Sequence, residues 1–360
     1  MKKLIIILTV IIVVLGLIYF IPKIFNSIKI TPAEAKVMSI DGITFEFNNS
    51  DIQLVENEPT TMNMIRDDDT LGYKIQKLNI TPTGIELYMR PLNMLWYNSN
   101  ILFANAKQNC LTVMNLKGEI IENIGKTGNG PGEFNIPRNI CADDKNNYYI
   151  IESGNRRIQI FNDKFEYVSE ININEISEKT EKIKGDPYSL AVTNEGDIYV
   201  SFHPLMNDTG GILYISSDRK NIKIIENMCG ILSVYQNDVY LLEFGEIVED
   251  NSQGIKQYVL QTGKNRFIKF KDGKISETYN FTEGYSASSL YLYSNKIFSY
   301  SLGIKRFNEF DMKSQYISTL LDTKNFIKEN HLLYGFIKDN EGAFYAIELE
   351  TGDLYKIYKE

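Results

Sequence analysis

Residues 125–162 read GKTGNGPGEFNIPRNICADDKNNYYIIESGNRRIQIFN and contain a glycine-rich turn, three short strands and a polar corner. The strands are marked by runs of β-branched and aromatic residues, which suit a pleated surface. A unit of this size cannot bury both of its faces alone. The stretch therefore predicts a repeat protein whose units pack against one another.

A hairpin pattern recurs along the chain, with an apolar strand on each side of a polar turn. Three copies have a short turn: residues 97–103 (YNSNILF), 235–241 (YQNDVYL) and 293–299 (YSNKIFS). Three have a longer turn: residues 144–150 (DKNNYYI), 194–200 (NEGDIYV) and 339–345 (DNEGAFY). Asn, Asp and Gly tolerate the positive φ that tight hairpins require. Six hairpins predict six units.

Each hairpin except the last is followed by a third apolar strand and a polar turn: residues 111–118, 158–164, 212–218, 267–273 and 305–311. A fourth strand, such as residues 119–124 or 274–279, completes most units. Successive hairpins are about 42 to 58 residues apart, which is typical of four-stranded propeller blades. The predicted fold is all-β, a six-bladed β-propeller of four-stranded antiparallel blades, with local helix expected only near residues 175–184 and 323–329.

Residues 125–162 resemble an NHL repeat. The resemblance is carried by the glycine-rich lead-in that ends in Phe134 and Pro137, and by the corner in which Asn155 precedes Arg157-Ile158-Gln159 and an aromatic residue. The preceding unit fits the pattern in diluted form, whereas the other four keep the strand rhythm without the signature residues. The resemblance implies an exported or membrane-anchored bacterial propeller in which the corner residues hold the blade together.

The last unit supplies only three strands before the sequence ends, so a fourth strand must come from elsewhere. Residues 85–90 (IELYMR) have the required alternation and precede the first blade. Pairing the two ends of the repeat region in one blade would remove a sheet edge and close the ring. Residues 43–47 and 52–55 are expected to form one or two additional strands.

Residues 4–21 are a run of eighteen mainly apolar residues behind Met1-Lys2-Lys3. Such a run spans roughly 27 Å as a helix, close to the thickness of a bilayer core. Cleavage after Ala35 is an alternative, but the run is longer than the core of most signal peptides. We expect one N-terminal transmembrane anchor (1–22), a linker with accessory strands (23–75) and an extracytoplasmic propeller (76–360).

Residues 36–360 carry 45 acidic and 34 basic side chains, a net charge of −11. This charge argues against a nucleic-acid partner, which requires clustered Lys and Arg. The three cysteines, Cys110, Cys141 and Cys229, are more typical of buried apolar residues than of a disulfide framework, although a bridge between Cys110 and Cys141 is the alternative. No metal-binding spacing and no cofactor motif is present.

Ligands of propellers bind where the inner strands begin, at the mouth of the channel. Several enzyme families share the six-bladed architecture: lactonase-like members place Glu, Asp and Asn around a calcium ion, and amidating lyases, which also look like NHL repeats, need several His for zinc. In this chain the inner strands begin with neutral residues, and only His203 and His331 are present. We therefore predict no catalytic residue. The candidate ligand-binding residues are Arg138, Asn139, Ser189, His203 and Ser289, with an interblade salt bridge as the alternative role of Arg138.

The sequence favours a non-enzymatic, membrane-tethered module that binds a protein, peptide or glycan at the cell envelope. A metal-dependent hydrolase or lyase of the six-bladed type with a divergent site is the alternative, and a purely structural role in an envelope assembly is a third. Trp96, the only tryptophan, is expected to pack between blades.

Overall fold

The computed structural model of the chain describes residues 36–40, 43–47, 71–78, 92–180, 185–204, 210–250, 257–261, 265–281, 285–301, 303–324, 326–327, 333–348 and 351–359. The chain separates into two compact units, Met1–Asn57 and Glu58–Glu360. The first unit contains the antiparallel hairpin of β1 (Lys36–Ile40) and β2 (Ile43–Phe47). The predicted strand at residues 43–47 is thus confirmed, whereas residues 4–21 and 52–55 lie outside the described residues. No helix in the ranges above is long and apolar enough to cross a bilayer.

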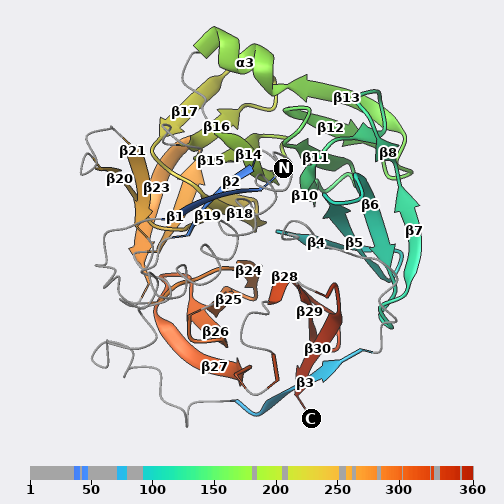
Figure 1. Cartoon of the computed structure of the whole chain (residues 1–360), viewed down its shortest axis with the longest axis vertical. Helices are drawn as coiled ribbons and strands as arrows, with labels where there is room; N and C mark the ends of the chain where they lie inside the picture. Colours follow the sequence, from blue (N-terminus) through green and yellow to red (C-terminus); the bar gives the residue numbers. More distant parts are fainter. Residues whose placement is uncertain are drawn as a thin grey trace, which may run out of the picture. The chain divides into compact units, whose positions relative to one another are not determined.

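The second unit is an all-β propeller of six four-stranded antiparallel blades, as predicted from the hairpins. Figure 1 shows the blades following one another around a ring. The strands of blades 1 to 3 are β4 (Met94–Tyr97), β5 (Asn100–Asn105), β6 (Cys110–Met114) and β7 (Ile120–Ile124); β10 (Pro137–Ala142), β11 (Tyr148–Glu152), β12 (Arg157–Phe161) and β13 (Tyr167–Asn172); and β14 (Asp186–Val192), β15 (Ile198–His203), β16 (Gly211–Ile215) and β17 (Ile222–Glu226).

The strands of blades 4 to 6 are β18 (Gly230–Tyr235), β19 (Asp238–Glu243), β22 (Arg266–Lys271) and β23 (Lys274–Asn280); β24 (Tyr291–Tyr293), β25 (Lys296–Ser301), β26 (Arg306–Asp311) and β27 (Tyr316–Asp322); and β28 (Leu333–Lys338), β29 (Phe344–Glu348), β30 (Leu354–Lys359) and β3 (Tyr73–Lys77). Each blade contacts the next, and β28 of blade 6 contacts β4 of blade 1, so the ring is closed. The helix α3 (Ile173–Thr180) follows blade 2.

Blade 6 joins the two ends of the repeat region, as predicted, but with a different strand. Its outermost strand is β3, which pairs with β30 from Tyr73 opposite Lys359 to Lys77 opposite Tyr355. The assignment of residues 85–90 to this position was therefore wrong, and those residues lie outside the described part of the chain. Polar and apolar residues alternate in both residues 73–77 and residues 85–90, so the sequence pattern alone does not choose between the two segments.

The short hairpin turns have the backbone that their sequences predict. Both central residues of each short turn have positive φ: Asn98 and Ser99, Gln236 and Asn237, and Ser294 and Asn295. The right-handed twist of the strands favours such turns because their own twist matches it.

The core lies between neighbouring blades, where the faces of two sheets pack together. Large aromatic side chains fill these layers, and Phe103, Tyr199 and Phe344 are among those that are fully buried. The three cysteines are free and buried, which confirms the apolar interpretation over the disulfide. Burial raises the pKa of the Cys141 thiol.

The NHL-like corner of blade 2 is a buried hydrogen-bond network centred on Glu152, whose side chain is fully buried. Its Oε1 accepts hydrogen bonds from Arg157 Nε (2.7 Å) and Gln159 Nε2 (2.8 Å). Its Oε2 accepts from the backbone N of Asn135 (2.8 Å) and from Asn155 Nδ2 (2.7 Å). The guanidinium of Arg157 also donates to carbonyls of the glycine-rich stretch, so the network fixes that stretch against the blade.

Blade 4 has the same acidic–basic corner, which the sequence pattern did not reveal. Glu243 ends the second strand and Arg266 begins the third, directly opposite it, as Glu152 and Arg157 do in blade 2. The two side chains form a salt bridge. A second hairpin, β20 (Glu246–Asp250) and β21 (Gln257–Gln261), is inserted between them. Blade 4 therefore keeps the acidic–basic pair. The pair was not recognised in the sequence because the inserted hairpin separates its two residues.

Candidate functional site

The propeller has two ends, which we name by the inner strands. The strand-start end is where the first strand of each blade begins, and the hairpin end is where the turns between first and second strands lie. Arg138, Asn139 and Ser189 lie near the starts of β10 and β14, and Ser289 precedes β24. His203 ends β15 opposite Asp186. The sequence-predicted residues therefore lie at the strand-start end.

Three of these residues are buried in the wall of the propeller. Asn139 Nδ2 donates a 3.1 Å hydrogen bond to Ser189 Oγ, which also accepts from the backbone N of Leu232 at 2.9 Å. These bonds join the inner strands of blades 2, 3 and 4. Ser289 Oγ accepts from the backbone N of Tyr300 at 2.9 Å within blade 5. The three side chains hold strands together and have almost no exposed surface.

Arg138 and His203 form a second group around Tyr188. A guanidinium nitrogen of Arg138 lies 3.7 Å from an Asp186 carboxylate oxygen, and the guanidinium lies 6.0 Å from the centre of the Tyr188 ring. The His203 ring packs 5.5 Å from the same tyrosine ring, and its Nδ1 lies 3.0 Å from the carbonyl of Pro204. The interblade salt bridge that was the alternative role of Arg138 is therefore present.

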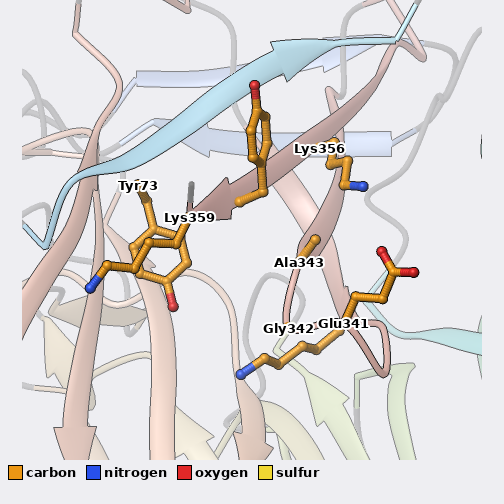
Figure 2. A pocket seen from close by; sticks show the side chains of 8 residues that line it. Tyr73, Glu341, Gly342, Ala343, Lys356 and Lys359 are labelled. Atoms are coloured by element: carbon orange, nitrogen blue, oxygen red, sulfur yellow. The ribbon is translucent and has the colours of Figure 1, made fainter.

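A pocket of about 310 Å³ lies at the hairpin end of blade 6, on the opposite end from the predicted residues. Figure 2 shows side chains that line it. They come from β3, from β28 and its hairpin turn, and from β30: Tyr73, Lys338, Glu341, Gly342, Ala343, Lys356, Tyr358 and Lys359. Three lysines and one carboxylate thus surround a hollow in a protein of net negative charge.

The ammonium group of Lys338 lies over aromatic rings. Its Nζ is 4.5 Å from the centre of the Tyr293 ring, 4.9 Å from that of Phe344 and 5.7 Å from that of Phe298. Burial among these groups lowers the pKa of Lys338 from its usual value, and Glu309 partly opposes the shift. Ring faces attract a cation and compensate part of its lost hydration. Phe298 and Phe344 are buried, whereas Tyr293 is exposed, so Lys338 connects the pocket to the exposed Tyr293 ring of blade 5.

Trp96 of blade 1 is a second exposed ring beside Lys338. Its indole N–H donates a 2.9 Å hydrogen bond to the carbonyl of Lys338, and its ring packs edge-on against Tyr345 at 6.0 Å. Trp96 therefore connects two blades, as expected. Its side chain is nevertheless 37% exposed, and that of Tyr293 is 46% exposed. We call Trp96, Tyr293 and the residues that line the pocket the blade 6 surface.

Asp339 stabilises the turn between β28 and β29, which forms part of the pocket. Asp339 Oδ1 accepts hydrogen bonds from the backbone N of Glu341 (3.0 Å) and of Ala343 (2.8 Å), and Oδ2 accepts from the hydroxyl of Tyr345 (3.2 Å). Burial and the Asp339 carboxylate raise the pKa of Tyr345 to about 12. Lys356 Nζ lies 5.7 Å from the Tyr345 ring and 5.9 Å from the Tyr358 ring. The turn and the strands beside it hold the lining in place.

The blade 6 surface was not predicted from the sequence. Its residues belong to strands far apart in the chain, and the predicted boundary between linker and propeller fell within β3. The close spacing of Lys356, Tyr358 and Lys359 at the end of the chain was the available signal. Among the residues that the structure places, no group of three or more His, Cys, Asp and Glu is arranged to hold a metal ion.

Comparison with known proteins supports the architecture. A family model described as a six-bladed β-propeller matches residues 86–201. Among solved structures, a luciferin-regenerating enzyme is 12% identical, with 79% of this chain and 95% of that chain covered and a TM-score of 0.54. A gluconolactonase from Xanthomonas campestris is 9% identical, with coverages of 78% and 93% and a TM-score of 0.51.

A catalytically inactive virginiamycin B lyase from Staphylococcus aureus, solved with quinupristin, is 14% identical, with coverages of 80% and 100% and a TM-score of 0.50. No curated protein matches the sequence at a significant level. At these identities the similarity shows the fold alone. The chain is a six-bladed β-propeller.

Proposed function

We propose that the protein is a non-enzymatic, membrane-tethered binding module at the cell envelope, and that its ligand binds at the blade 6 surface. The observation that carries this proposal is the pocket of about 310 Å³, which lies within the size range typical of ligand sites. The apolar run at residues 4–21 supports the tether and the extracytoplasmic position. The corner network of blade 2 supports a place in the NHL-repeat family.

The charges around the pocket support a binding role. Within the described part of the chain, Lys338, Lys356 and Lys359 form no ion pair with a carboxylate. By contrast, Lys296 on the neighbouring blade 5 pairs with Glu309. The ammonium groups of Lys338 and Lys356 contact aromatic rings, and Lys359 is exposed. An anionic partner can therefore pair with these charges without displacing a carboxylate of the described residues.

The strand-start end offers less to a ligand. Asn139 and Ser189 are hydrogen-bonded to neighbouring strands with almost no exposed surface, and Arg138 already faces Asp186. A ligand would have to replace these interactions before it gained its own. At the hairpin end, Lys359, Trp96 and Tyr293 are exposed, and Lys338 and Lys356 are half-buried.

Lysine footprinting of the full chain in detergent micelles tests the proposal. Acetylation rates of Lys338, Lys356 and Lys359 are measured with and without protein and polysaccharide fractions of the cell envelope, and exposed Lys313 is the internal control. At least one fraction is expected to slow acetylation of the three pocket lysines and leave that of Lys313 unchanged. The proposal fails if no fraction protects them, and turnover of a small ester or lactone would replace it with the enzyme alternative.

A further inference from the structure

We infer that the blade 6 surface binds an acidic saccharide, a short chain of sugar rings that carry carboxylates. This inference rests on the proposed binding function and specifies its ligand class. The charge of the pocket, the positions of its lysines and the aromatic rings around it support this ligand class.

The charge of the pocket selects an anion. Three lysines and only Glu341 line it, although the propeller region is strongly acidic overall. Long-range attraction therefore does not bring anions to this protein, and recognition depends on contacts within the pocket. An ammonium group pairs with a carboxylate through charge-assisted hydrogen bonds, which are stronger than neutral ones.

The positions of the lysines favour several anionic groups over one. In Figure 2, Tyr73 and Lys359 lie together on one side of the pocket, and Lys356 and Glu341 lie on the other side. β30 separates the side chains of Lys356 and Lys359, because residues three apart in a strand point to opposite faces. Lys356 and Lys359 therefore approach the pocket from different sides of β30, and a chain with an acid group on each unit can pair with each in turn.

The aromatic side chains favour a sugar over an acidic peptide. Tyr73 and Tyr358 line the pocket, and the exposed rings of Trp96 and Tyr293 lie beyond Lys338. Aromatic rings supply rigid apolar contact area at low entropic cost. The C–H face of a sugar ring is flat and packs on them, while the side chains of Asp and Glu have no such face. A pocket at the small end of the usual range fits a short segment of chain.

Trp96 gives a direct readout of this site because it is the only tryptophan in the chain and adjoins Lys338. The full chain in detergent micelles is titrated with trigalacturonate, with neutral galactotriose and with triglutamate, while tryptophan emission is followed. We expect a saturable change with trigalacturonate that weakens as salt is added, no saturation with galactotriose, and at least tenfold weaker binding of triglutamate.

Variants locate the binding. Lys356→Gln and, separately, Lys359→Gln are expected to weaken trigalacturonate binding about fivefold, the worth of one partly exposed ion pair. Lys313→Gln, on the hairpin end of blade 5, is the matched control and should leave the affinity unchanged. Lys359 is exposed at the end of its strand, so its variant tests the idea even if Lys356→Gln disturbs the fold.

The inference is overturned if triglutamate binds as tightly as trigalacturonate, if the neutral sugar binds equally well, or if neither pocket variant weakens binding. Failure of all three probes, with only a protein fraction of the envelope still protecting the pocket lysines from acetylation, would reject the saccharide and retain the binding function. Failure of the probes together with absence of protection would reject both.

Discussion

Replacement of Glu152 by Gln perturbs the buried corner of blade 2 with almost no change of shape. Gln substitutes an NH2 group, which only donates, for one carboxylate oxygen that only accepts. The two oxygens of Glu152 each accept two hydrogen bonds, from Arg157 and Gln159 on one side and from Asn135 and Asn155 on the other. In either orientation, the new NH2 group therefore faces two donors.

The expected destabilisation follows from these contacts. A buried donor left without an acceptor costs about 1–3 kcal/mol, and two such donors are created. An independent estimate, about 3–5 kcal/mol, applies to removal of one partner of a buried ion pair. Because Glu152 is fully buried and the Arg157 side chain is 7% exposed, both estimates describe the same loss. We expect the free energy of unfolding to fall by about 4 kcal/mol.

Thermal unfolding of the full chain measures the effect. At about 2 °C per kcal/mol for a domain of this size, Glu152→Gln should lower Tm by roughly 8 °C. Glu170→Gln is the matched control, because Glu170 binds the same guanidinium at 2.8 Å but is 36% exposed. Its cost should be about 1 kcal/mol or less. Equal Tm values for the two variants would refute the assignment of Glu152 as the buried centre of the corner.

Three further predictions concern the closure, the tyrosines and the buried thiol. Deletion of residues 353–360 removes β30, which pairs with both β29 and β3, and should abolish cooperative unfolding by circular dichroism; a cooperative transition in the truncated chain would contradict the closed ring. Burial raises the pKa of Tyr149 and Tyr345 from 10 to about 12, so stability should fall as pH rises from 10 to 12, because the unfolded chain loses these protons first. Phenolate absorbance should rise together with unfolding, and full titration of a still folded chain near pH 10 would show that the tyrosines are not buried. Cys141 is buried with a raised pKa, so a thiol reagent followed by mass spectrometry should modify it only after unfolding; rapid labelling of the native chain would contradict its placement.

The repeat architecture could be predicted from sequence because its signals are local. Turn residues such as Asn98 and Asn295 report the positive φ of a tight hairpin, and the strands beside them follow. The corner of blade 2 was equally visible, because Glu152 and Arg157 are close in sequence and pair directly. In blade 4, an inserted hairpin separates Glu243 from Arg266 in the sequence, so the same interaction could not be recognised from a local motif.

The closure and the candidate site depended on contacts between distant parts of the chain. Residues 73–77 and 85–90 both alternate, and the choice between them is made by pairing with β30, which no local pattern records. The pocket brings Tyr73, Lys338 and Lys356 together only once that pairing has formed. Asn139 and Ser189 mark the starts of inner strands, as expected, but the structure uses them to join blades.

A crystal structure of the full chain grown with trigalacturonate shows directly which end of the propeller binds the saccharide. We expect density for the saccharide in the pocket of blade 6, with carboxylates beside Lys356 and Lys359 and a sugar ring against Tyr73 or Tyr358. Density at the strand-start end beside Arg138 and Tyr188, with an empty blade 6 pocket, would contradict it.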